Sequence, residues 1–455
     1  MDVAGKKILV VGLGRSGLSA CAFLARRGAA VVGTDVKPRE SFGDDIGKLE
    51  KEGVAFIFGD HDAETFGSSD MIVLSPGVPP DIKPVLAAEE AGVDILSEVE
   101  LAYRFNHGIL IGITGTKGKS TTTTILGHIL AEAGFDARVG GNIGRPFIDL
   151  VEGSTPATVS VIELSSFQLE KIRFFRADLV LLLSLFPDHL DRYPSFEAYV
   201  AAKKNIFLNM QENDRVLVNY DDPRCMGLAG ETKAEKILYS TRRELGDGFG
   251  ISGEHICRFR QGRAIPLLET RLVRLKGRHS LSNVLAACAG ASLLDVPPAK
   301  MKKAVTEFAG LEHCLEPVGT IAGRDFYNDS KATNAEAVRE ALSTFRGNVL
   351  LIMGGLDKGS DFSLLREAIG KKVKALFLIG DSSARLAGQY RGLSDITGCG
   401  SLEEAAEKAF QASAPGDTIL LSPGCASFDM FTDYAHRGRI FKQAFETLKK
   451  KAGHG

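Results

Sequence analysis

A glycine-rich loop between an apolar run and a helical pattern is the feature that most constrains the fold of this chain. Residues 112–121 are Gly-Ile-Thr-Gly-Thr-Lys-Gly-Lys-Ser-Thr. The apolar run 109–113 predicts a buried strand, and isoleucine and leucine at helical spacing predict a helix over 120–135. Backbone N–H groups of such a loop point at phosphate oxygens, while Lys119 supplies a positive charge and Ser120 a hydroxyl for Mg²⁺. The loop therefore predicts a nucleoside triphosphate site. A glycine-rich turn without a ligand stays an alternative, because the first glycine of the usual pattern is missing.

The first segment of the chain carries a second glycine turn. A predicted strand is followed by Gly12-Leu13-Gly14-Arg15-Ser16-Gly17 and a helix, which is the Gly-x-Gly-x-x-Gly spacing of a dinucleotide fold. A second strand, 30–34, ends at Asp35, about where an acidic residue would meet a ribose hydroxyl. A further strand, 71–74, leads into Ser75-Pro76-Gly77. Repeated strand and helix units predict a parallel sheet, but the turn alone does not distinguish NAD from other pyrophosphate ligands.

Later strands of the second segment end in polar groups. Strand 159–162 leads into Glu163, and strand 179–185 leads into Asp188 and His189. Open α/β sheets bind ligands at the carboxyl ends of their strands, so Glu163 is placed to reach Mg²⁺ at the phosphates. The alternative for Glu163 is that it caps a helix or lies on the surface without a ligand. The alternative for His189 is that it faces solvent or packs in the core.

The third segment repeats the same plan. Strands over 349–353, 375–379 and 418–421 each end in a loop of polar or small residues. The sequence therefore predicts an α/β protein of three domains. Their expected boundaries are 1–107, 108–311 and 312–455. Three such units that bring loops to a cleft favour an enzyme that joins several substrates.

Composition favours small ligands. Basic and acidic residues number 55 and 57, which gives a net charge of −2, so no basic face for nucleic acid is expected. The seven cysteines include no Cys-x-x-Cys pair, which favours reduced thiols over a disulfide framework or a zinc site. A strand rather than a signal peptide follows the first residues, and the longest apolar run, 179–186, is far shorter than the ~20 residues of a membrane span. We expect a cytoplasmic protein that does not bind membranes.

Five motifs together identify a family. They are Gly115-Thr116-Lys117-Gly118-Lys119-Ser120-Thr121, Gly141-Asn142-Ile143-Gly144, Glu163-Leu164-Ser165-Ser166-Phe167-Gln168, Asp188-His189-Leu190-Asp191-Arg192-Tyr193 and Asn328-Asp329-Ser330-Lys331-Ala332-Thr333-Asn334. In this order they resemble the ATP-dependent Mur ligases, and the resemblance covers nearly the whole chain. It implies a Rossmann-like N-terminal domain that binds a UDP-linked substrate rather than NAD, a central P-loop ATP-binding domain and a Rossmann-like C-terminal domain that binds an amino acid.

Within the family, the third and fifth motifs look like those of the members that add D-glutamate to UDP-N-acetylmuramoyl-L-alanine. The family chemistry implies that ATP phosphorylates the acceptor carboxylate and that the amine of D-glutamate attacks the acyl phosphate, in the synthesis of bacterial cell-wall precursors. Another Mur-type ligase, a folylpolyglutamate-type ligase, an NAD-dependent oxidoreductase and an inactive nucleotide sensor stay as alternatives. The expected partners are these substrates, and the expected state is a monomer. Closure of the third domain about hinges near Gly108 and Gly310 is expected as well.

The resemblance also assigns roles to individual residues. The residues expected to bind ATP are Gly115, Thr116, Lys117, Gly118, Lys119, Ser120, Thr121, Asn283 and Asp329. Those expected to bind the UDP-linked substrate are Ser16, Lys37, Gly77, Asn142, Ser165 and Gln168. Those expected to bind D-glutamate are Thr333, Lys358, Ser427 and Tyr434, the last through its backbone. The expected catalytic residues are Lys119, Glu163, His189, Lys203 and Lys331.

Two Mg²⁺ ions and a modified lysine are implied in the same way. The metal-binding residues are expected to be Ser120, Glu163, His189 and Lys203. Lys203 matches the family lysine that CO₂ carbamylates, which turns a cation into an anion able to hold or orient a metal. Its neighbour Lys204 is the alternative for this position.

Four positions depart from the family pattern. Cys314 stands where many relatives have an arginine that reaches the ATP phosphates. Lys117 and Ser280 each replace an asparagine, and Tyr434 replaces a phenylalanine. We hypothesise that Lys117 makes up part of the charge missing at Cys314.

Overall fold

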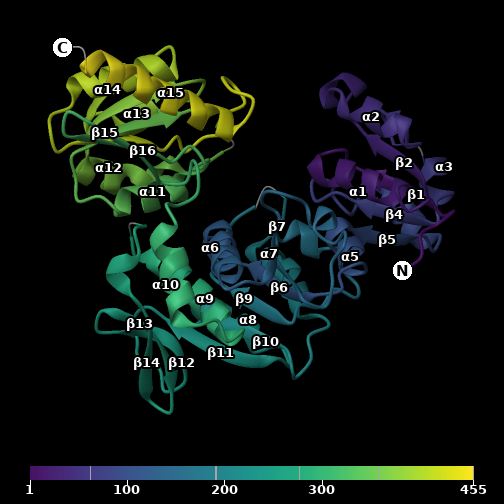
Figure 1. Cartoon of the computed structure of the whole chain (residues 1–455). Helices are drawn as coiled ribbons and strands as arrows, with labels where there is room; N and C mark the ends of the chain where they lie inside the picture. Colours follow the sequence, from purple (N-terminus) through teal and green to yellow (C-terminus); the bar gives the residue numbers. More distant parts are fainter. Residues whose placement is uncertain (62, 190–191, 276, 358, 454–455) are drawn as a thin grey trace. The chain divides into compact units, whose positions relative to one another are not determined.

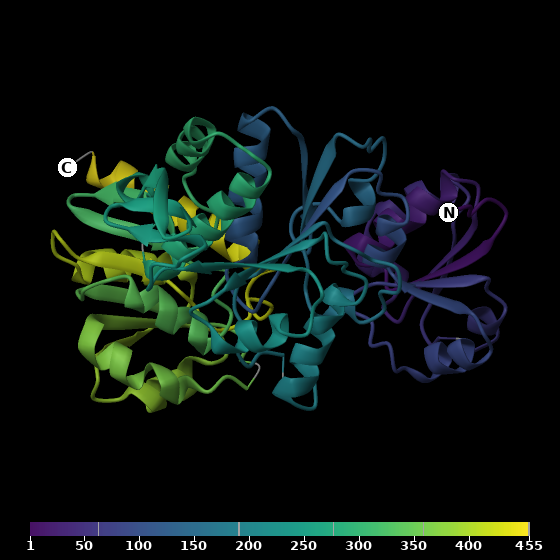
Figure 2. The same ribbon diagram turned by 90° about the horizontal axis from the view of Figure 1, so that it is seen from below.

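The computed structural model describes residues 1–61, 63–189, 192–275, 277–357 and 359–453. Within these ranges the strands form three sheets with helices packed on them (Figures 1 and 2). The chain divides into two compact units, one of Met1–Val273 with Arg278–Phe308 and the other of Arg274–Gly277 with Ala309–Gly455. The first unit contains the first and second sheets, and the second unit contains the third. The predicted α/β class is confirmed.

The first sheet is parallel and has the strand order β3-β2-β1-β4-β5, of which Figure 1 labels β2, β1, β4 and β5. Its strands are β1 Lys7–Val11, β2 Ala30–Asp35, β3 Ala55–Phe58, β4 Met71–Leu74 and β5 Asp94–Ser97. Its helices are α1 Arg15–Ala25, η1 Arg39–Phe42, α2 Asp45–Lys51, α3 Ala63–Gly67, α4 Lys83–Glu90 and α5 Glu98–Tyr103. Successive side chains of a strand face opposite sides, so Ile8 and Val10 belong to the core beneath α1, whereas Leu9 and Val11 belong to the core beneath α4.

The turns after β1, β2 and β4 are locked together at the carboxyl edge of this sheet. Gly12 has a φ of 86°, and a Cβ on Gly17 would lie 1.9 Å from the Gly12 carbonyl oxygen, so both positions require glycine. The Ser75 hydroxyl donates to that same carbonyl oxygen at 2.6 Å. The Leu13 N–H donates to Asp35 Oδ2 at 2.7 Å. The Asp35 carboxylate therefore supports the glycine turn from within the protein.

The second sheet has the order β14-β13-β12-β11-β10-β9-β6-β8-β7. Its strands are β6 Ile109–Thr114, β7 Asp136–Gly141, β8 Thr158–Glu163, β9 Leu179–Leu182, β10 Arg215–Asn219, β11 Glu235–Ser240, β12 Gly248–Ser252, β13 His255–Arg260 and β14 Arg263–Glu269. Its helices are α6 Lys119–Glu132, η2 Phe147–Asp149, η3 Phe167–Leu169, α7 Phe196–Lys204, η4 Asn205–Phe207, α8 Pro223–Ala229, η5 Thr270–Leu272, α9 Arg278–Leu293 and α10 Pro298–Glu307. The strands from β12 to β14 pair antiparallel, and the others pair in parallel. This parallel region contains the strands next to the phosphate loop.

The third sheet has the order β15-β16-β20-β17-β18-β19, with β15 antiparallel to β16 and the remaining pairs parallel. Its strands are β15 Glu316–Ile321, β16 Arg324–Asn328, β17 Val349–Gly354, β18 Val373–Ile379, β19 Asp395–Gly398 and β20 Thr418–Leu421. Its helices are α11 Ala335–Ser343, η6 Phe362–Leu365, α12 Arg366–Lys372, α13 Ser383–Tyr390, α14 Leu402–Ala412 and α15 Tyr434–Ala452. Helices α11, α12 and α13 pack on one face, and α14 and α15 pack on the other. No helix in the described part of the chain is long and apolar enough to cross a membrane.

Two buried carboxylates on α5 join the first sheet to the second. Glu98 Oε1 accepts the Ile148 N–H at 2.7 Å. Glu100 Oε2 accepts the three successive N–H groups of residues 173–175, at 2.9, 3.0 and 2.9 Å, while Arg104 donates to the other Glu100 oxygen at 2.8 Å. One hydrophobic cluster also runs through both sheets. The two sheets therefore form a single unit.

Glu98 is expected to make this joint sensitive to pH. The residue is 1% exposed, and burial raises the pKa of its carboxyl to about 7 from the ordinary 4.5. Between these values the folded protein binds more protons than the unfolded chain, so stability falls as the pH rises. We expect Glu98→Gln to raise the Tm of the first unit by about 5 °C at pH 8.5 and to leave it unchanged at pH 5.

Calorimetry of the variant and the parent protein at both pH values measures this difference. The glutamine side chain keeps the oxygen that accepts the Ile148 N–H, so the exchange isolates the charge. Glu90, which is exposed at the end of α4, offers a matched control, and Glu90→Gln should give no difference at either pH. An equal shift of Tm at both pH values would contradict a raised pKa of Glu98 in the folded protein.

Candidate active site

The phosphate loop connects β6 to α6 and is shaped by two glycines. Gly115 and Gly118 have φ values of 148° and 86°, which other residues rarely adopt. A Cβ on Gly118 would lie 2.3 Å from Asn283 Oδ1, so the loop packs directly against α9. Lys119 Nζ donates to the carbonyl oxygens of Gly115 at 3.0 Å and Thr116 at 2.8 Å. The Lys119 ammonium is thus held over the loop.

The segment after β9 holds this loop in place. The Ser184 carbonyl oxygen accepts the Thr116 N–H at 2.7 Å, and the Ser184 hydroxyl accepts the Lys117 N–H at 3.0 Å. The Thr116 hydroxyl donates to the Phe186 carbonyl oxygen at 3.1 Å. Because the chain turns to make these contacts, β9 ends at Leu182, earlier than the sequence predicted.

Glu163, the last residue of β8, has one unpaired carboxylate oxygen. The residue is 2% exposed and lies opposite Ile113 of the strand that leads into the phosphate loop. Its Oε1 accepts from Asn142 Nδ2 at 2.8 Å, whereas Oε2 is buried with no hydrogen-bond partner among the described residues. A buried, unpaired carboxylate oxygen is costly unless a cation or a donor completes it. The unpaired oxygen of Glu163 is therefore suited to bind a cation.

The donor set fits Mg²⁺ better than a metal held by protein groups alone. In the described ranges, no group of three or more His, Cys, Asp or Glu side chains is arranged to hold a metal. Mg²⁺ is usually bound by one or two carboxylates together with substrate phosphates and water. A single carboxylate at Glu163, on the strand beside the phosphate loop, meets that requirement.

Lys203 on α7 is a buried amine next to the same loop. The residue is 1% exposed, and its Nζ donates to the Gly115 carbonyl oxygen at 2.9 Å. Burial and then the charge of Lys119 hold the pKa of this amine well below its usual value, and Asp188 and Glu163 oppose them. A lowered pKa increases the fraction of a lysine amine that is unprotonated and nucleophilic.

One tyrosine links His189 to the rest of the site. The His189 ring packs edge-on against Phe167, with centroids 4.8 Å apart, and lies 6.2 Å from the Tyr199 ring. The Tyr199 hydroxyl is hydrogen-bonded to the Thr116 hydroxyl at 3.0 Å, and the Lys203 amine lies 4.8 Å from the ring centre. The His189 side chain is 45% exposed and is therefore open to a ligand.

The residues predicted to bind the UDP-linked substrate form two groups in the first unit. Ser16, Lys37 and Gly77 follow β1, β2 and β4, which are neighbouring parallel strands, so all three lie at one edge of the first sheet. Arg15 Nη1 donates to the Gly144 carbonyl oxygen at 2.7 Å. The glycine turn of the first sheet and the second sequence motif are therefore in contact.

The second group lies in loops of the second sheet. Gln168 Oε1 accepts both the N–H and the hydroxyl of Ser165 at 3.0 Å. Asn142 donates to Glu163, and its N–H donates to the Glu163 carbonyl oxygen at 2.9 Å. Asn142, one of the predicted substrate contacts, is thus bonded directly to the predicted metal ligand, and Ser165 and Gln168 follow that ligand in the chain.

In the second unit, the residues after β16 are fixed from two sides. The Asp329 carboxylate accepts the Leu315 N–H at 3.0 Å and the Ser422 hydroxyl at 2.8 Å. The Lys331 N–H donates to the His313 carbonyl oxygen at 3.0 Å. The segment before β15 and the loop after β20 therefore set the position of both predicted functional residues.

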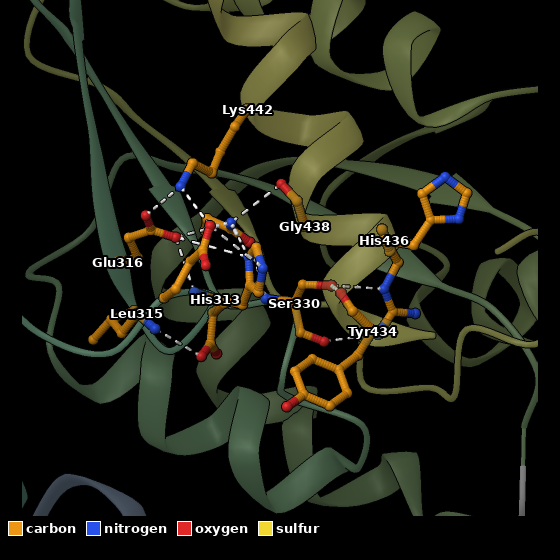
Figure 3. A network of polar contacts seen from close by, with 12 residues as sticks. His313, Leu315, Glu316, Ser330, Tyr434, His436, Gly438 and Lys442 are labelled. Carbon is orange, nitrogen blue, oxygen red and sulfur yellow. Dashed lines mark hydrogen bonds and ion pairs between the residues drawn. The ribbon is translucent and has the colours of Figure 1, made fainter. Parts of the chain in front are cut away.

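The buried His313 also helps to hold the end of β16 in place (Figure 3). The His313 Nδ1 lies 2.9 Å from Asn328 Nδ2, which also donates to Glu316 Oε2 at 3.1 Å. Lys442 of α15 pairs with Glu316 at 2.8 Å. Because the amide nitrogen of Asn328 can only donate, Nδ1 of His313 accepts this hydrogen bond, and burial lowers the pKa of the imidazole. The network joins the segment before β15, the end of β16 and α15.

The described residues predicted to bind D-glutamate are Thr333 after β16, Ser427 after β20 and Tyr434 at the start of α15. Ser427 is buried and Thr333 is exposed. Tyr434 is the first residue of α15, so its N–H has no intrahelical acceptor, and its carbonyl oxygen accepts the Ser330 hydroxyl at 2.7 Å (Figure 3). Lys358 lies outside the described residues.

Sequence reasoning assigned no role to two arginines that make extensive contacts. Arg192 donates to Glu170 at 2.8 Å and to the carbonyl oxygens of Pro76 and Val78 at 3.4 Å, which ties the fourth motif to a turn of the first sheet. Arg437 is completely buried in the second unit. Arg192 lies inside the fourth sequence motif, so the sequence could have indicated that it has a role. Arg437 belongs to an amphipathic helix, where a basic residue normally indicates a solvent-exposed face.

The phosphate loop, the carboxylate open to a cation and the buried amine define the class of protein: this is a P-loop, nucleotide-dependent enzyme. Three protein-family profiles match the chain in order. They are "Mur ligase MurD-like, N-terminal domain" over residues 6–97, "Mur ligase middle domain" over 113–291 and "Mur ligase, glutamate ligase domain" over 314–425.

Similar proteins extend the match over the full chain. The UDP-N-acetylmuramoylalanine--D-glutamate ligase of Acidobacterium capsulatum is 43% identical over 444 residues, covering 97% of this chain and 96% of the relative. The enzyme of the same name from Solibacter usitatus is 43% identical over 451 residues, covering 99% and 100%. The chain belongs to the Mur ligase family and is an ATP-dependent acid–amino-acid ligase. This separates it from the oxidoreductases that share its Gly-x-Gly-x-x-Gly turn.

Solved structures show the same fold. The MurC ligase of Thermotoga maritima matches with a TM-score of 0.63 at 19% identity, covering 98% of this chain and 100% of that chain. The MurF ligase of the same organism, in complex with ADP, matches with a TM-score of 0.59 at 14% identity, covering 99% and 96%. The predicted fold of three α/β domains is confirmed.

Proposed function

We propose that this protein adds D-glutamate to UDP-N-acetylmuramoyl-L-alanine at the expense of ATP, a step in the synthesis of peptidoglycan precursors. The observation that carries the proposal is the identity of 43% with ligases of that name over nearly the whole of both chains. Both the acceptor and ATP are cytoplasmic metabolites, so we place the reaction in the cytoplasm. We expect the working form to be a monomer.

The reaction has two steps. The acceptor carboxylate attacks the γ-phosphorus of ATP, which releases ADP and leaves an acyl phosphate. The amine of D-glutamate then attacks the acyl carbon, loses a proton and expels inorganic phosphate to form the amide. Anionic groups must approach one another in the first step, so catalysis relies on positioning and on charge compensation by groups such as Lys119.

We assign the three substrates to the three predicted domains, 1–107, 108–311 and 312–455. The UDP-linked acceptor is assigned to Ser16, Lys37, Gly77, Asn142, Ser165 and Gln168. ATP is assigned to the phosphate loop from Gly115 to Thr121, to Asn283 and to Asp329. D-Glutamate is assigned to Thr333, Lys358, Ser427 and the backbone of Tyr434, with Lys331 at the reacting groups. The grouping of these residues at strand ends supports the assignment.

We assign Ser120 and Glu163 to one Mg²⁺ site, and His189 and Lys203 to a second. When bound, Mg²⁺ neutralises the developing charge on the phosphoryl oxygens. The buried and unpaired Glu163 Oε2 supports the first site. The exposed ring of His189, close to Tyr199 and the phosphate loop, supports the second.

We also propose that Lys203 is carbamylated. The neutral amine attacks the carbon of CO₂, an N–C bond forms, and one proton is released as the carbamate anion appears. The low pKa of this buried amine supports the chemistry, because only the unprotonated form reacts. Lys204 is exposed and paired with Glu231, which makes it the weaker alternative.

Phosphate release from ATP tests the function. The assay contains Mg²⁺ and UDP-N-acetylmuramoyl-L-alanine, with D-glutamate, L-glutamate, L-lysine or meso-diaminopimelate in separate reactions. Release that depends on D-glutamate alone is expected. Release with a diamino acid instead would overturn the substrate assignment, and no release with any amino acid would overturn the proposed function.

Lys117→Asn is expected to raise the KM for ATP about fivefold, since a half-exposed charge facing phosphate contributes little more than a surface ion pair. Initial rates at varied ATP measure the effect. The double variant Lys117→Asn/Cys314→Arg, which restores the arginine of the family pattern, should recover most of the loss. An unchanged KM in the single variant would remove the idea that Lys117 compensates for Cys314.

A further inference from the structure

Arg437 is the largest completely buried side chain among the described residues. Within the part of the chain that the structure describes, every hydrogen bond of its guanidinium goes to a neutral acceptor of a loop. Nε donates to the Ser330 hydroxyl at 3.0 Å, and Nη2 donates to the Ser330 carbonyl oxygen at 2.8 Å. Nη1 donates to the carbonyl oxygens of Cys425 at 3.1 Å and Ala426 at 3.4 Å. One planar group therefore joins two separate loops.

A third loop also touches the guanidinium. A Cβ on Gly355 would lie 3.3 Å from Arg437 Nη1, so the loop after β17 passes directly over it. The three loops follow β16, β20 and β17, which are neighbouring parallel strands. They carry Thr333, Ser427 and Lys358, the side chains assigned to D-glutamate.

This burial is costly in terms of stability alone. None of the hydrogen bonds from the guanidinium to described residues goes to a carboxylate. Burial lowers the pKa of Arg437 to about 10, and the charges of Cys425 and Asp429 oppose this shift. Burying a charge without a directly bonded counterion is costly, and buried ionic groups can often be replaced by apolar groups at no loss of stability. A charge kept in such a place indicates a requirement beyond folding.

The contacts of Arg437 indicate what its charge is needed for. The Ser330 hydroxyl, which accepts from Arg437, donates in turn to the Tyr434 carbonyl oxygen at the start of α15. Arg437 therefore fixes the first turn of its own helix to the loop after β16. All segments assigned to D-glutamate converge on this one side chain.

We propose that Arg437 is the positioning residue of the amino-acid site, holding the loops after β16, β17 and β20 and the start of α15 in the arrangement that receives D-glutamate. The inference rests on the proposed function and deepens it. Arg437 acts through the loops and does not react itself. Lysine cannot replace it, because an ammonium lacks the planar set of donors that reaches two loops at once.

The residues of this unit that we assign to ATP and to the reacting groups are held by other contacts. Asp329 is fixed by the Leu315 N–H and the Ser422 hydroxyl, and the Lys331 N–H is fixed by the His313 carbonyl oxygen. Loss of Arg437 should therefore affect D-glutamate far more than ATP. A general loss of folding would affect both.

Initial-rate kinetics of the full-length Arg437→Lys variant test the proposal. The KM for D-glutamate is expected to rise about 30-fold, with the KM values for ATP and UDP-N-acetylmuramoyl-L-alanine within twofold of the parent. Arg439, exposed two residues along α15, is the matched control, and Arg439→Lys should change none of the three values. Parallel KM changes for ATP and D-glutamate, or no change for D-glutamate, would overturn the proposal.

A milder variant covers the case in which Arg437→Lys does not fold. Ser330→Ala removes the hydroxyl that links the guanidinium to Tyr434 but keeps the backbone acceptor. It should raise the KM for D-glutamate about fivefold in a protein that still folds, and an unchanged KM would overturn the inference. A parent protein that shows no phosphate release with D-glutamate would instead refute the proposed function, so the two failures are distinguishable.

Discussion

Glu163→Gln is expected to lower kcat/KM about 10³-fold, which corresponds to the loss of about 4 kcal/mol of transition-state stabilisation by a metal. Glutamine has nearly the same shape and keeps the oxygen that accepts from Asn142. It replaces the buried, unpaired Oε2 by an amide nitrogen, which cannot bind a cation. Initial rates over a wide range of Mg²⁺ concentration give the measurement, and the variant should need far more Mg²⁺ for half-maximal rate.

Glu152→Gln provides the control for this experiment. Glu152 belongs to the same unit, but its side chain is 56% exposed and pairs only loosely with Arg26. The rate and the Mg²⁺ requirement of the Glu152→Gln variant should match those of the parent protein. A Glu163→Gln variant with the parental Mg²⁺ requirement would show that the carboxylate does not hold the metal.

Lys203→Arg is expected to lose about 10³-fold in kcat, because a guanidinium stays protonated and cannot take up CO₂. In the parent protein, ¹³C NMR after equilibration with ¹³C-labelled CO₂ should show one carbamate signal, and the variant should lack it. Activity of the parent should also fall in buffer freed of CO₂ and return when bicarbonate is added.

The neighbouring lysine makes the control unusually close. Lys204→Arg preserves an exposed cation paired with Glu231 and should keep both the carbamate signal and the activity. If the signal disappears in Lys204→Arg instead, the carbamate belongs to the other lysine. Full activity of Lys203→Arg would remove the carbamate from the mechanism altogether.

The parallel strands were the most predictable part of the fold. The strand over 71–74 and the strand over 418–421 have the predicted bounds, and the phosphate-loop strand is only one residue longer than predicted. Such strands are buried on both faces and appear in the sequence as continuous apolar runs. The strand over 179–185 was predicted too long, because apolar content does not reveal that Ser184 leaves the sheet to bond the phosphate loop.

Side chains in motifs could be placed at strand ends, but their mutual contacts could not be foreseen. The end of β8 predicts that Glu163 faces a ligand edge, whereas its pairing with Asn142 depends on the loop after β7. Burial of charge was missed altogether. Glu98, Glu100 and Arg437 lie in helical patterns where charged residues usually face water, so only packing against distant segments identifies them.

The carboxylates of α5 have a consequence for domain exchange between family members. The profile of the first domain ends at residue 97, immediately before Glu98 and Glu100. A chimera cut there would leave both acids in the polypeptide that also supplies Ile148 and residues 173–175, their hydrogen-bond partners. A cut at residue 107, the boundary predicted from the sequence, would import foreign side chains opposite those N–H groups. Modular recombination in this family is therefore expected to succeed at the start of α5 and to fail at its end.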